Sequence, residues 1–121
     1  ETQLTWGPYE NDVAGAKSRH DGRANTKALG LAGLSGKTYP AANWAAMYTP
    51  DDHCDFHLPS QAELFMASLH APQAFNKEGW YWSSTQYSAD GAFVQDFEYG
   101  YSGWLDKGVE RRVRAVRWIP L

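Results

Sequence analysis

The stretch Gly79-Trp80-Tyr81-Trp82-Ser83-Ser84-Thr85 decides the fold, together with Arg112-Val113-Arg114-Ala115-Val116-Arg117 near the end of the chain. Both stretches carry strand-forming residues at regular spacing, so they are predicted to be framework. Between them lie side chains that suit contacts better than a core. A rigid frame that displays such side chains favours a binding surface over a catalytic pocket. The expected ligand-binding residues are Tyr87, Asp90, Asp96, Glu98, Tyr99, Tyr101, Trp104 and Asp106.

Two helical segments precede this region. Pro40 suits the first position of a helix that is predicted to run through Tyr48, and residues 24–34 are mildly helical. Pro50, Asp51 and Asp52 end the helix that begins at Pro40.

A clearer helix begins after Ser60. Ser60 and Glu63 form a capping box, in which the Ser hydroxyl and the Glu carboxylate each accept a backbone amide. Leu64, Phe65 and Leu69 fall on one face at helical spacing, which predicts an amphipathic helix that ends before Pro72.

Strand signals dominate from Gly79 onward. Strands are predicted at residues 4–6, 80–84, 92–97 and 112–119. Because helices come first and strands later, the predicted class is α+β. A chain of 121 residues is expected to form a single domain, residues 1–121.

Composition narrows the function. Aromatic residues make up 15% of the chain and six of them are Trp, which is typical of irregular cores or of recognition surfaces. The formal charge of −3 argues against a nucleic-acid partner. No apolar run approaches the roughly 20 residues of a membrane span, so no membrane insertion is expected. The chain begins at Glu1 rather than Met, and we expect it to be the C-terminal part of a longer protein.

An ordered set of short motifs carries a resemblance. It comprises Leu58-Pro59-Ser60-Gln61-Ala62-Glu63-Leu64, Tyr81-Trp82-Ser83-Ser84-Thr85 and Val113-Arg114-Ala115-Val116-Arg117. With them the chain resembles the family named for the C-terminal domain of the Legionella collagen-like adhesin. The resemblance implies a C-type-lectin-like fold: two helices, a small antiparallel sheet that ties the termini together, and a second, loop-bearing sheet.

The resemblance also implies a function. Relatives of this kind occur on bacterial adhesins and phage tails, and the tail of this chain is similar to the variable regions of diversity-generating retroelements. It therefore implies a non-enzymatic domain, on a bacterial cell surface or a phage virion, that binds a cell-surface glycan or protein receptor. Weak single sites would gain from multivalency, so a homotrimer is plausible.

Two other functions stay open. Lys107, Arg111, Arg112 and Arg114 form a local basic cluster that could bind a sulfated polysaccharide such as a glycosaminoglycan, although pairing with acids such as Asp96 or Glu98 is the favoured interpretation. The domain could also be a structural trimeric cap of a fibre. An apolar patch at the paired termini would then be buried between subunits. Its candidate residues are Gln3, Leu4, Trp6, Trp118, Ile119 and Leu121. The favoured interpretation is that these residues belong to the ordinary core of the terminal sheet.

Metal binding and catalysis have little support. The segment from Asp51 to His57 is rich in ligand types, but its two His residues would share a face only on a helix, and Pro50 and Pro59 disfavour a helix there. No metal and no cofactor are therefore expected, apart from a structural calcium should Asp90, Asp96 and Asp106 converge. Cys54 with His57 or His70 lacks an evident third group, and no catalytic motif is present, so no enzyme activity is expected.

Overall fold

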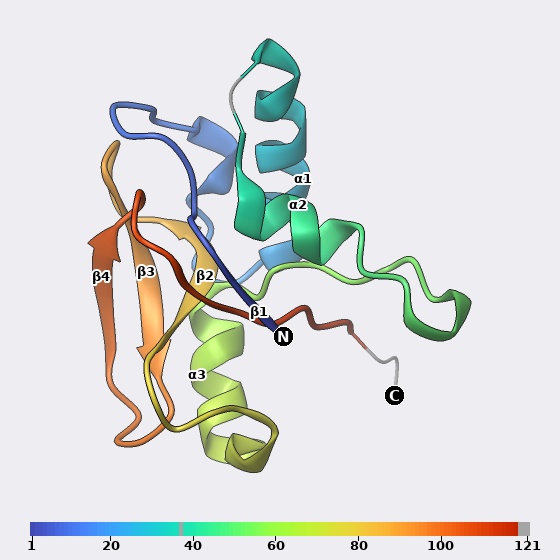
Figure 1. Cartoon of the computed structure of the whole chain (residues 1–121), viewed down its shortest axis with the longest axis vertical. Coiled ribbons are helices and arrows are strands. Elements are labelled where there is room, and N and C mark those ends of the chain that lie inside the picture. Colours follow the sequence, from blue (N-terminus) through green and yellow to red (C-terminus); the bar gives the residue numbers. More distant parts are fainter. Residues whose placement is uncertain (37, 119–121) are drawn as a thin grey trace.

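The computed structural model describes residues 1–36 and 38–118, and this part of the chain has the predicted α+β fold (Figure 1). Its α-helices are α1 (Gly22–Ala32), α2 (Pro40–Ala46) and α3 (Gln61–His70). Its strands are β1 (Thr2–Leu4), β2 (Trp80–Gln86), β3 (Gly91–Asp96), β4 (Ser102–Asp106) and β5 (Arg111–Val113). Short 3-10 turns lie at Ala14–Ala16, Gly33–Ser35, Pro50–Asp52 and Pro72–Ala74.

All five strands belong to one sheet, in the order β1-β5-β2-β3-β4. Neighbouring strands are antiparallel except β2 and β5, which are joined by one parallel pair, Tyr81 with Arg112. The terminal regions pair as the resemblance implies, because Gln3 of β1 lies opposite Arg112 of β5. The expectation of two separate sheets is wrong, since the Tyr81–Arg112 pair merges the terminal strands with the others.

The expected elements need three further corrections. The first strand is expected at residues 4–6, but β1 is Thr2–Leu4. Three α-helices are present in residues 1–36 and 38–118 rather than the two that the resemblance implies. The final strand was expected from 112 to 119, but β5 ends at Val113. Beyond it Val116 exchanges two backbone hydrogen bonds with His57, which draws the chain away from the three-residue β1. The end of the expected strand, at Ile119, lies outside the described residues.

The sheet is packed on both faces. Adjacent residues of a strand point to opposite faces, so Trp82 and Tyr81 enter different cores. Trp82 packs with Val94, Val113 and residues of α1 and α2 such as Leu29 and Ala42. Tyr81 packs with Leu64 of α3 and with Phe75 and Phe97. The Phe75 and Phe97 rings stack at 4.0 Å and Tyr81 meets both edge-on.

Buried polar residues at the end of β2 tie the loops to the sheet. The Thr85 hydroxyl donates to the Ser18 carbonyl (2.8 Å) and accepts from the Gln61 amide (3.0 Å). The Ser84 amide donates to the Pro59 carbonyl (2.7 Å). Buried polar groups need such partners, so this run fixes where α3 begins relative to the sheet.

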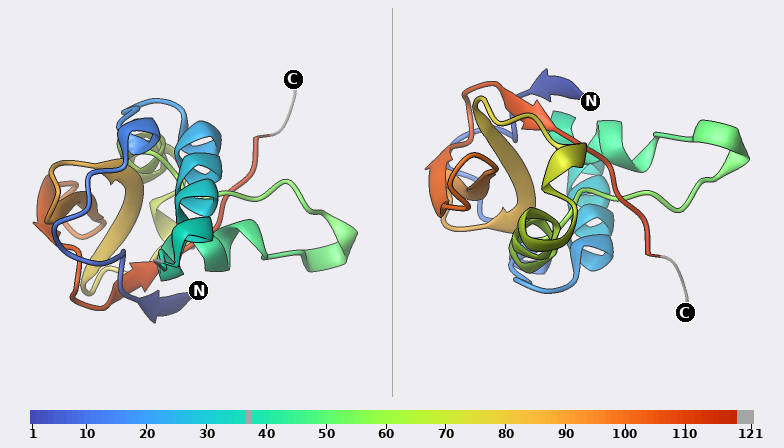
Figure 2. Two further views of the ribbon diagram at one scale, coloured as in Figure 1. Left: turned by 90° about the horizontal axis from the view of Figure 1, so that it is seen from above. Right: turned by 90° about the horizontal axis from the view of Figure 1, so that it is seen from below.

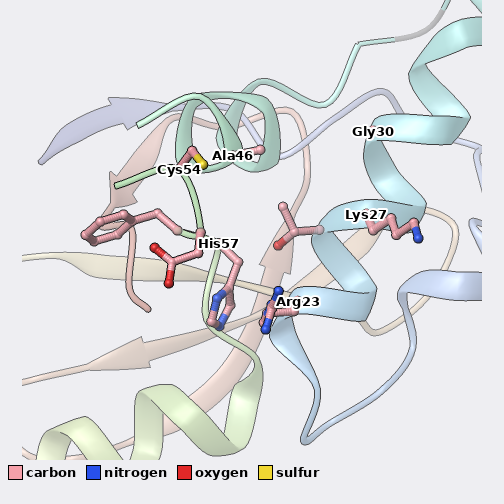
Figure 3. Close-up of a pocket in the computed structure, with 9 residues that line it drawn as sticks. Arg23, Lys27, Gly30, Ala46, Cys54 and His57 are labelled. Carbon is pink, nitrogen blue, oxygen red and sulfur yellow. The ribbon is translucent and has the colours of Figure 1, made fainter. Parts of the chain in front are cut away.

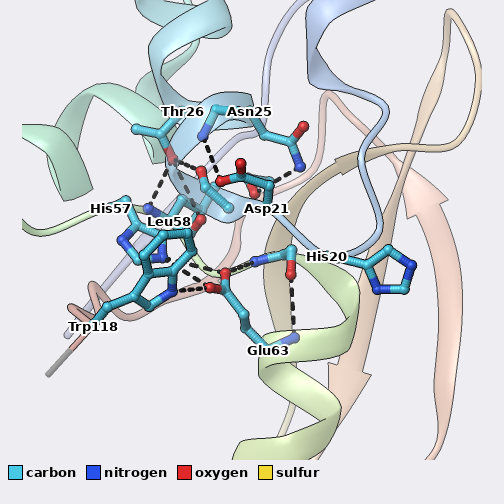
Figure 4. A network of polar contacts seen from close by, with 12 residues as sticks. His20, Asp21, Asn25, Thr26, His57, Leu58, Glu63 and Trp118 are labelled. Atoms are coloured by element: carbon cyan, nitrogen blue, oxygen red, sulfur yellow. Dashed lines mark hydrogen bonds and ion pairs between the residues drawn. The ribbon is translucent and has the colours of Figure 1, made fainter. Parts of the chain in front are cut away.

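The start of α3 is also joined to α1 by a polar network (Figure 4). The predicted capping box is confirmed: the Ser60 hydroxyl accepts from the Glu63 amide, and the Glu63 carboxylate accepts from the Ser60 amide. The same carboxylate contacts His57 at 3.2 Å and accepts from the Trp118 indole. Burial alone would raise the pKa of Glu63, but these hydrogen bonds together hold it below its usual value.

Candidate recognition surface

A pair of half-exposed rings stands on β4 and the end of β2. Trp104 lies directly opposite Phe93 across the β3–β4 ladder, so both side chains are on one face. The Trp104 indole stacks on Tyr87, with centroids 4.7 Å apart and an 8° angle between planes. Tyr87 meets Phe93 edge-on at 5.4 Å. Phe93 is buried, whereas Trp104 is 48% and Tyr87 50% exposed.

Gly91 and Arg19 help to position these rings. A Cβ atom at Gly91 would lie 2.8 Å from Cε3 of Trp104, so glycine allows the indole to lie across β3. The Arg19 guanidinium lies 5.1 Å from the Phe93 ring centroid, within cation–π range. Arg19 belongs to a loop that lies more than 70 residues before Phe93 in the chain. No local sequence pattern therefore predicts this contact.

A second pair of rings occupies the hairpin between β3 and β4. Tyr99 is 70% and Tyr101 64% exposed, and their rings lie 5.8 Å apart. Asp96 builds this turn, because its carboxylate accepts from the Glu98 and Tyr99 amides at 3.2 and 2.8 Å. Gly100 has φ +79°, which favours glycine. Asp96 itself is buried, so the structure places this predicted ligand residue in the turn and not on the exposed surface.

Helix α3 contributes exposed apolar side chains next to these rings, which the sequence did not predict. Phe65 and Leu69 are exposed, although they share a predicted apolar face with the buried Leu64. They line a depression of about 520 Å³ whose other wall includes Tyr99 and Glu98. Phe65 also lines a smaller hollow of about 290 Å³ beside β4, where Gln61 donates to the Ser102 hydroxyl at 3.2 Å (lining residues Arg19, His20, Gln61, Ala62, Phe65 and Ser102).

Phe65 lines both hollows and so links these features, which we together call the display surface. It runs along β4 from the Tyr87–Trp104 pair, past the hollow at Ser102, to Tyr99 and Tyr101. Its residues are Tyr87, Glu98, Tyr99, Tyr101, Trp104 and Asp106 from the predicted set, with Phe65 and Leu69 from α3.

The three Asp residues considered for calcium do not converge. Asp106 pairs with Gly91 at one end of β4, next to Asp90, whose carboxylate accepts from the Glu10 amide at 2.7 Å. Asp96 lies at the other end of β3. Within residues 1–36 and 38–118, no group of three or more His, Cys, Asp or Glu side chains is placed to hold a metal ion.

Lys107 is inside the molecule and does not belong to a basic surface. Its ammonium donates to the Asn11 carbonyl and to Oε1 of Gln86, both at 2.8 Å, and lies 4.7 Å from the Trp6 ring centroid. Burial lowers the pKa of Lys107 to about 8. A polysaccharide could not reach this charge in the folded protein.

Of the remaining basic residues, Arg112 and Arg114 pair within the chain. Arg112 forms an ion pair with Glu1 at 3.0 Å and donates to the Glu78 carbonyl at 2.6 Å. Arg114 lies 4.0 Å from Glu1 and over the Phe75 ring. Arg111 is half-buried. The favoured interpretation, intramolecular pairing, is thus confirmed for Arg112 and Arg114. The acidic partner is Glu1 rather than Asp96 or Glu98.

Two residues of the expected patch at the termini belong to the core. Trp6 is 1% exposed, and Leu4 packs against the larger core cluster. Gln3 and Trp118 are exposed. Ile119 and Leu121 lie outside the described residues.

A hollow of about 270 Å³ lies between α1 and the segment that carries Cys54 (Figure 3). The Cys54 side chain lies beside Ala46, whereas the His57 ring is directed toward Arg23. His57 is 2% exposed and its Nε2 contacts Glu63. The two residues therefore line one hollow without forming a nucleophile–base pair.

No protein-family model, curated protein or solved structure gives a significant match to this chain. Among the described residues, no helix is long and apolar enough to cross a membrane.

Proposed function

We propose that this chain is a non-enzymatic recognition domain that binds a cell-surface glycan or protein receptor through the display surface. The observation that carries this proposal is the exposed Tyr87–Trp104 stack, seated on the buried Phe93. Large rings provide contact area at a low cost in conformational entropy, and they stack on the apolar faces of sugars. The shallow hollows beside the rings suit an extended ligand better than a small molecule.

The frame beneath the surface supports this proposal. Trp104 is held by Tyr87 and by its close approach to Gly91, and the Tyr99–Tyr101 hairpin is held by Asp96. Such preorganisation lowers the entropy lost on binding. In this proposal the fold is C-type-lectin-like and the domain acts outside the cell, on a bacterial surface or a phage virion, where several copies would raise avidity.

Neither alternative function gains support from the geometry. Lys107 is buried and Arg112 and Arg114 share Glu1, so a site for sulfated polysaccharide would have to break existing contacts. Trp6 and Leu4 pack in the core, so they offer no apolar face for a fibre cap.

A direct test is binding to an array of glycans and bacterial surfaces, with the wild type compared to a Tyr101→Ala/Trp104→Ala variant. We expect the variant to lose at least tenfold in affinity, since truncating a ring anchor costs about 2 kcal/mol or more. The matched control is Tyr48→Ala/Trp118→Ala, which removes the same residue types from partly exposed sites elsewhere.

Three outcomes separate the functions. Loss of signal in the Tyr101→Ala/Trp104→Ala variant alone would support the display surface. A signal that survives this variant but disappears in moderate salt would move the site to the arginines. A signal lost only in the control variant would contradict the proposal.

A further inference from the structure

Strand β4 forms one edge of the sheet. It pairs with β3 on one side, and no strand within residues 1–36 and 38–118 pairs with its other side (Figures 1 and 2). An edge strand presents unpaired backbone donors and acceptors, which can template pairing with another chain.

The register shows which backbone groups face outward. The Asp96 amide donates to the Tyr101 carbonyl (2.8 Å), and the Lys107 amide donates to the Asp90 carbonyl (2.9 Å). Antiparallel ladders alternate, so the odd-numbered residues of β4 bond to β3. The amides and carbonyls of Ser102 and Trp104 therefore point away from the sheet.

Gly103 lies between these two residues and pairs with Val94 of β3, but no contact inside the chain requires a glycine there. No atom lies within 4 Å of where its Cβ would be, and its backbone is not in the left-handed region. A glycine in the middle of a strand costs stability, and it commonly marks a place where another backbone approaches closely.

We propose that β4 pairs antiparallel with β4 of a second copy of this chain, centred on Gly103. Gly103 then faces its counterpart in a non-hydrogen-bonded pair, with Cα atoms about 4.5 Å apart. Ser102 of each copy faces Trp104 of the other in two hydrogen-bonded pairs, which satisfy the outward amides and carbonyls.

This register is self-complementary in charge and in shape. The carboxylate within β4 is that of Asp106, which faces Gly100 of the second copy, so no carboxylate of this strand opposes another. The two Trp104 side chains are diagonal neighbours, about 7–8 Å apart in such a ladder and within reach of each other. A foreign peptide would have to reproduce this pattern by chance, whereas a second copy provides it.

Pairing of this kind goes beyond the proposed function. The two-fold axis would be perpendicular to the sheet, so both display surfaces would open on the same side and could bind one multivalent target. The contact is short, so we expect a weak dimer that depends on concentration.

The test is the mass of the whole chain in solution, by analytical ultracentrifugation from micromolar to millimolar concentration. We expect the wild type to approach twice its 13.6 kDa. Gly103→Lys should stay monomeric at every concentration, because like charges would face each other directly. Its fold should persist, as circular dichroism can verify, because the site has open space. The matched control is Gly30→Lys, at another open glycine, which should dimerise like the wild type.

A second variant tests the register itself. In a Cys54→Ser background, Gly103→Cys should form an intermolecular disulfide on mild oxidation, because the expected Cα separation suits one. Gly30→Cys should not. A wild type that stays monomeric throughout, or a Gly103→Lys variant that dimerises normally, would overturn the proposal. Neither experiment involves a ligand, so the proposed function would be unaffected.

Discussion

Lys107 shows how one side chain can hold distant parts of this chain together. It joins the loop at Asn11 to the end of β2 at Gln86, and it lies under the Trp6 ring. Burial favours the neutral amine, so the pKa falls to about 8 from the usual 10.5. The folded protein therefore releases this proton at a lower pH than the unfolded chain does.

This burial predicts a specific dependence on pH. Between pH 8 and 10.5 the unfolded chain keeps the Lys107 proton and the folded chain releases it, so the free energy of unfolding rises with pH. We expect a gain of about 1–3 kcal/mol between pH 8 and 10 relative to a Lys107→Met variant, since one pKa unit corresponds to about 1.4 kcal/mol.

Urea unfolding of both proteins at pH 7, 8, 9 and 10 measures this difference. Only the slope against pH is compared, because Lys107→Met also removes two hydrogen bonds. The series ends at pH 10 because burial and the Glu1 carboxylate raise the pKa of Tyr81 to about 12, which gives the opposite slope above pH 10. Equal slopes in the two proteins would contradict the assignment of a buried, charged Lys107.

Among the elements, helix α3 shows where sequence reasoning succeeds and where it stops. The capping box at Ser60 and Glu63 depends only on local chemistry, so the start of the helix is predicted correctly. Periodicity groups Leu64 with Phe65 and Leu69, but it does not say which of them faces the sheet. In the fold Leu64 meets Tyr81 and Phe97, while Phe65 and Leu69 remain exposed.

The identity of the buried face of α3 can be tested by truncating single side chains. Leu64→Ala should lower the free energy of unfolding by about 2–5 kcal/mol, because it leaves a cavity beside Tyr81. Leu69→Ala, at a side chain that is 59% exposed, should change it by less than about 0.5 kcal/mol. Chemical denaturation of the two variants checks the difference, and similar losses for both would mean that α3 is rotated about its axis.

At the scale of the molecule, the sequence predicts the class, the clearest helix start and the four Tyr and Trp residues of the display surface. The sequence does not predict contacts between distant parts of the chain. Glu1 pairs with Arg112, and Lys107 donates to Asn11, in each case across about a hundred residues. No local pattern encodes such contacts, because the whole sheet has to form first. The same reason hid the contribution of α3 to the display surface.

The most direct test of the display surface follows the six Trp indoles by nitrogen-15 NMR while a ligand from the array is added. Trp6 and Trp82 are buried and donate to backbone carbonyls, so their signals should stay in place. We expect the Trp104 signal to shift most, and a Trp104→Phe variant identifies that signal. A ligand that moves the signal of Trp44 or Trp118 while Trp104 stays unchanged would contradict this expectation.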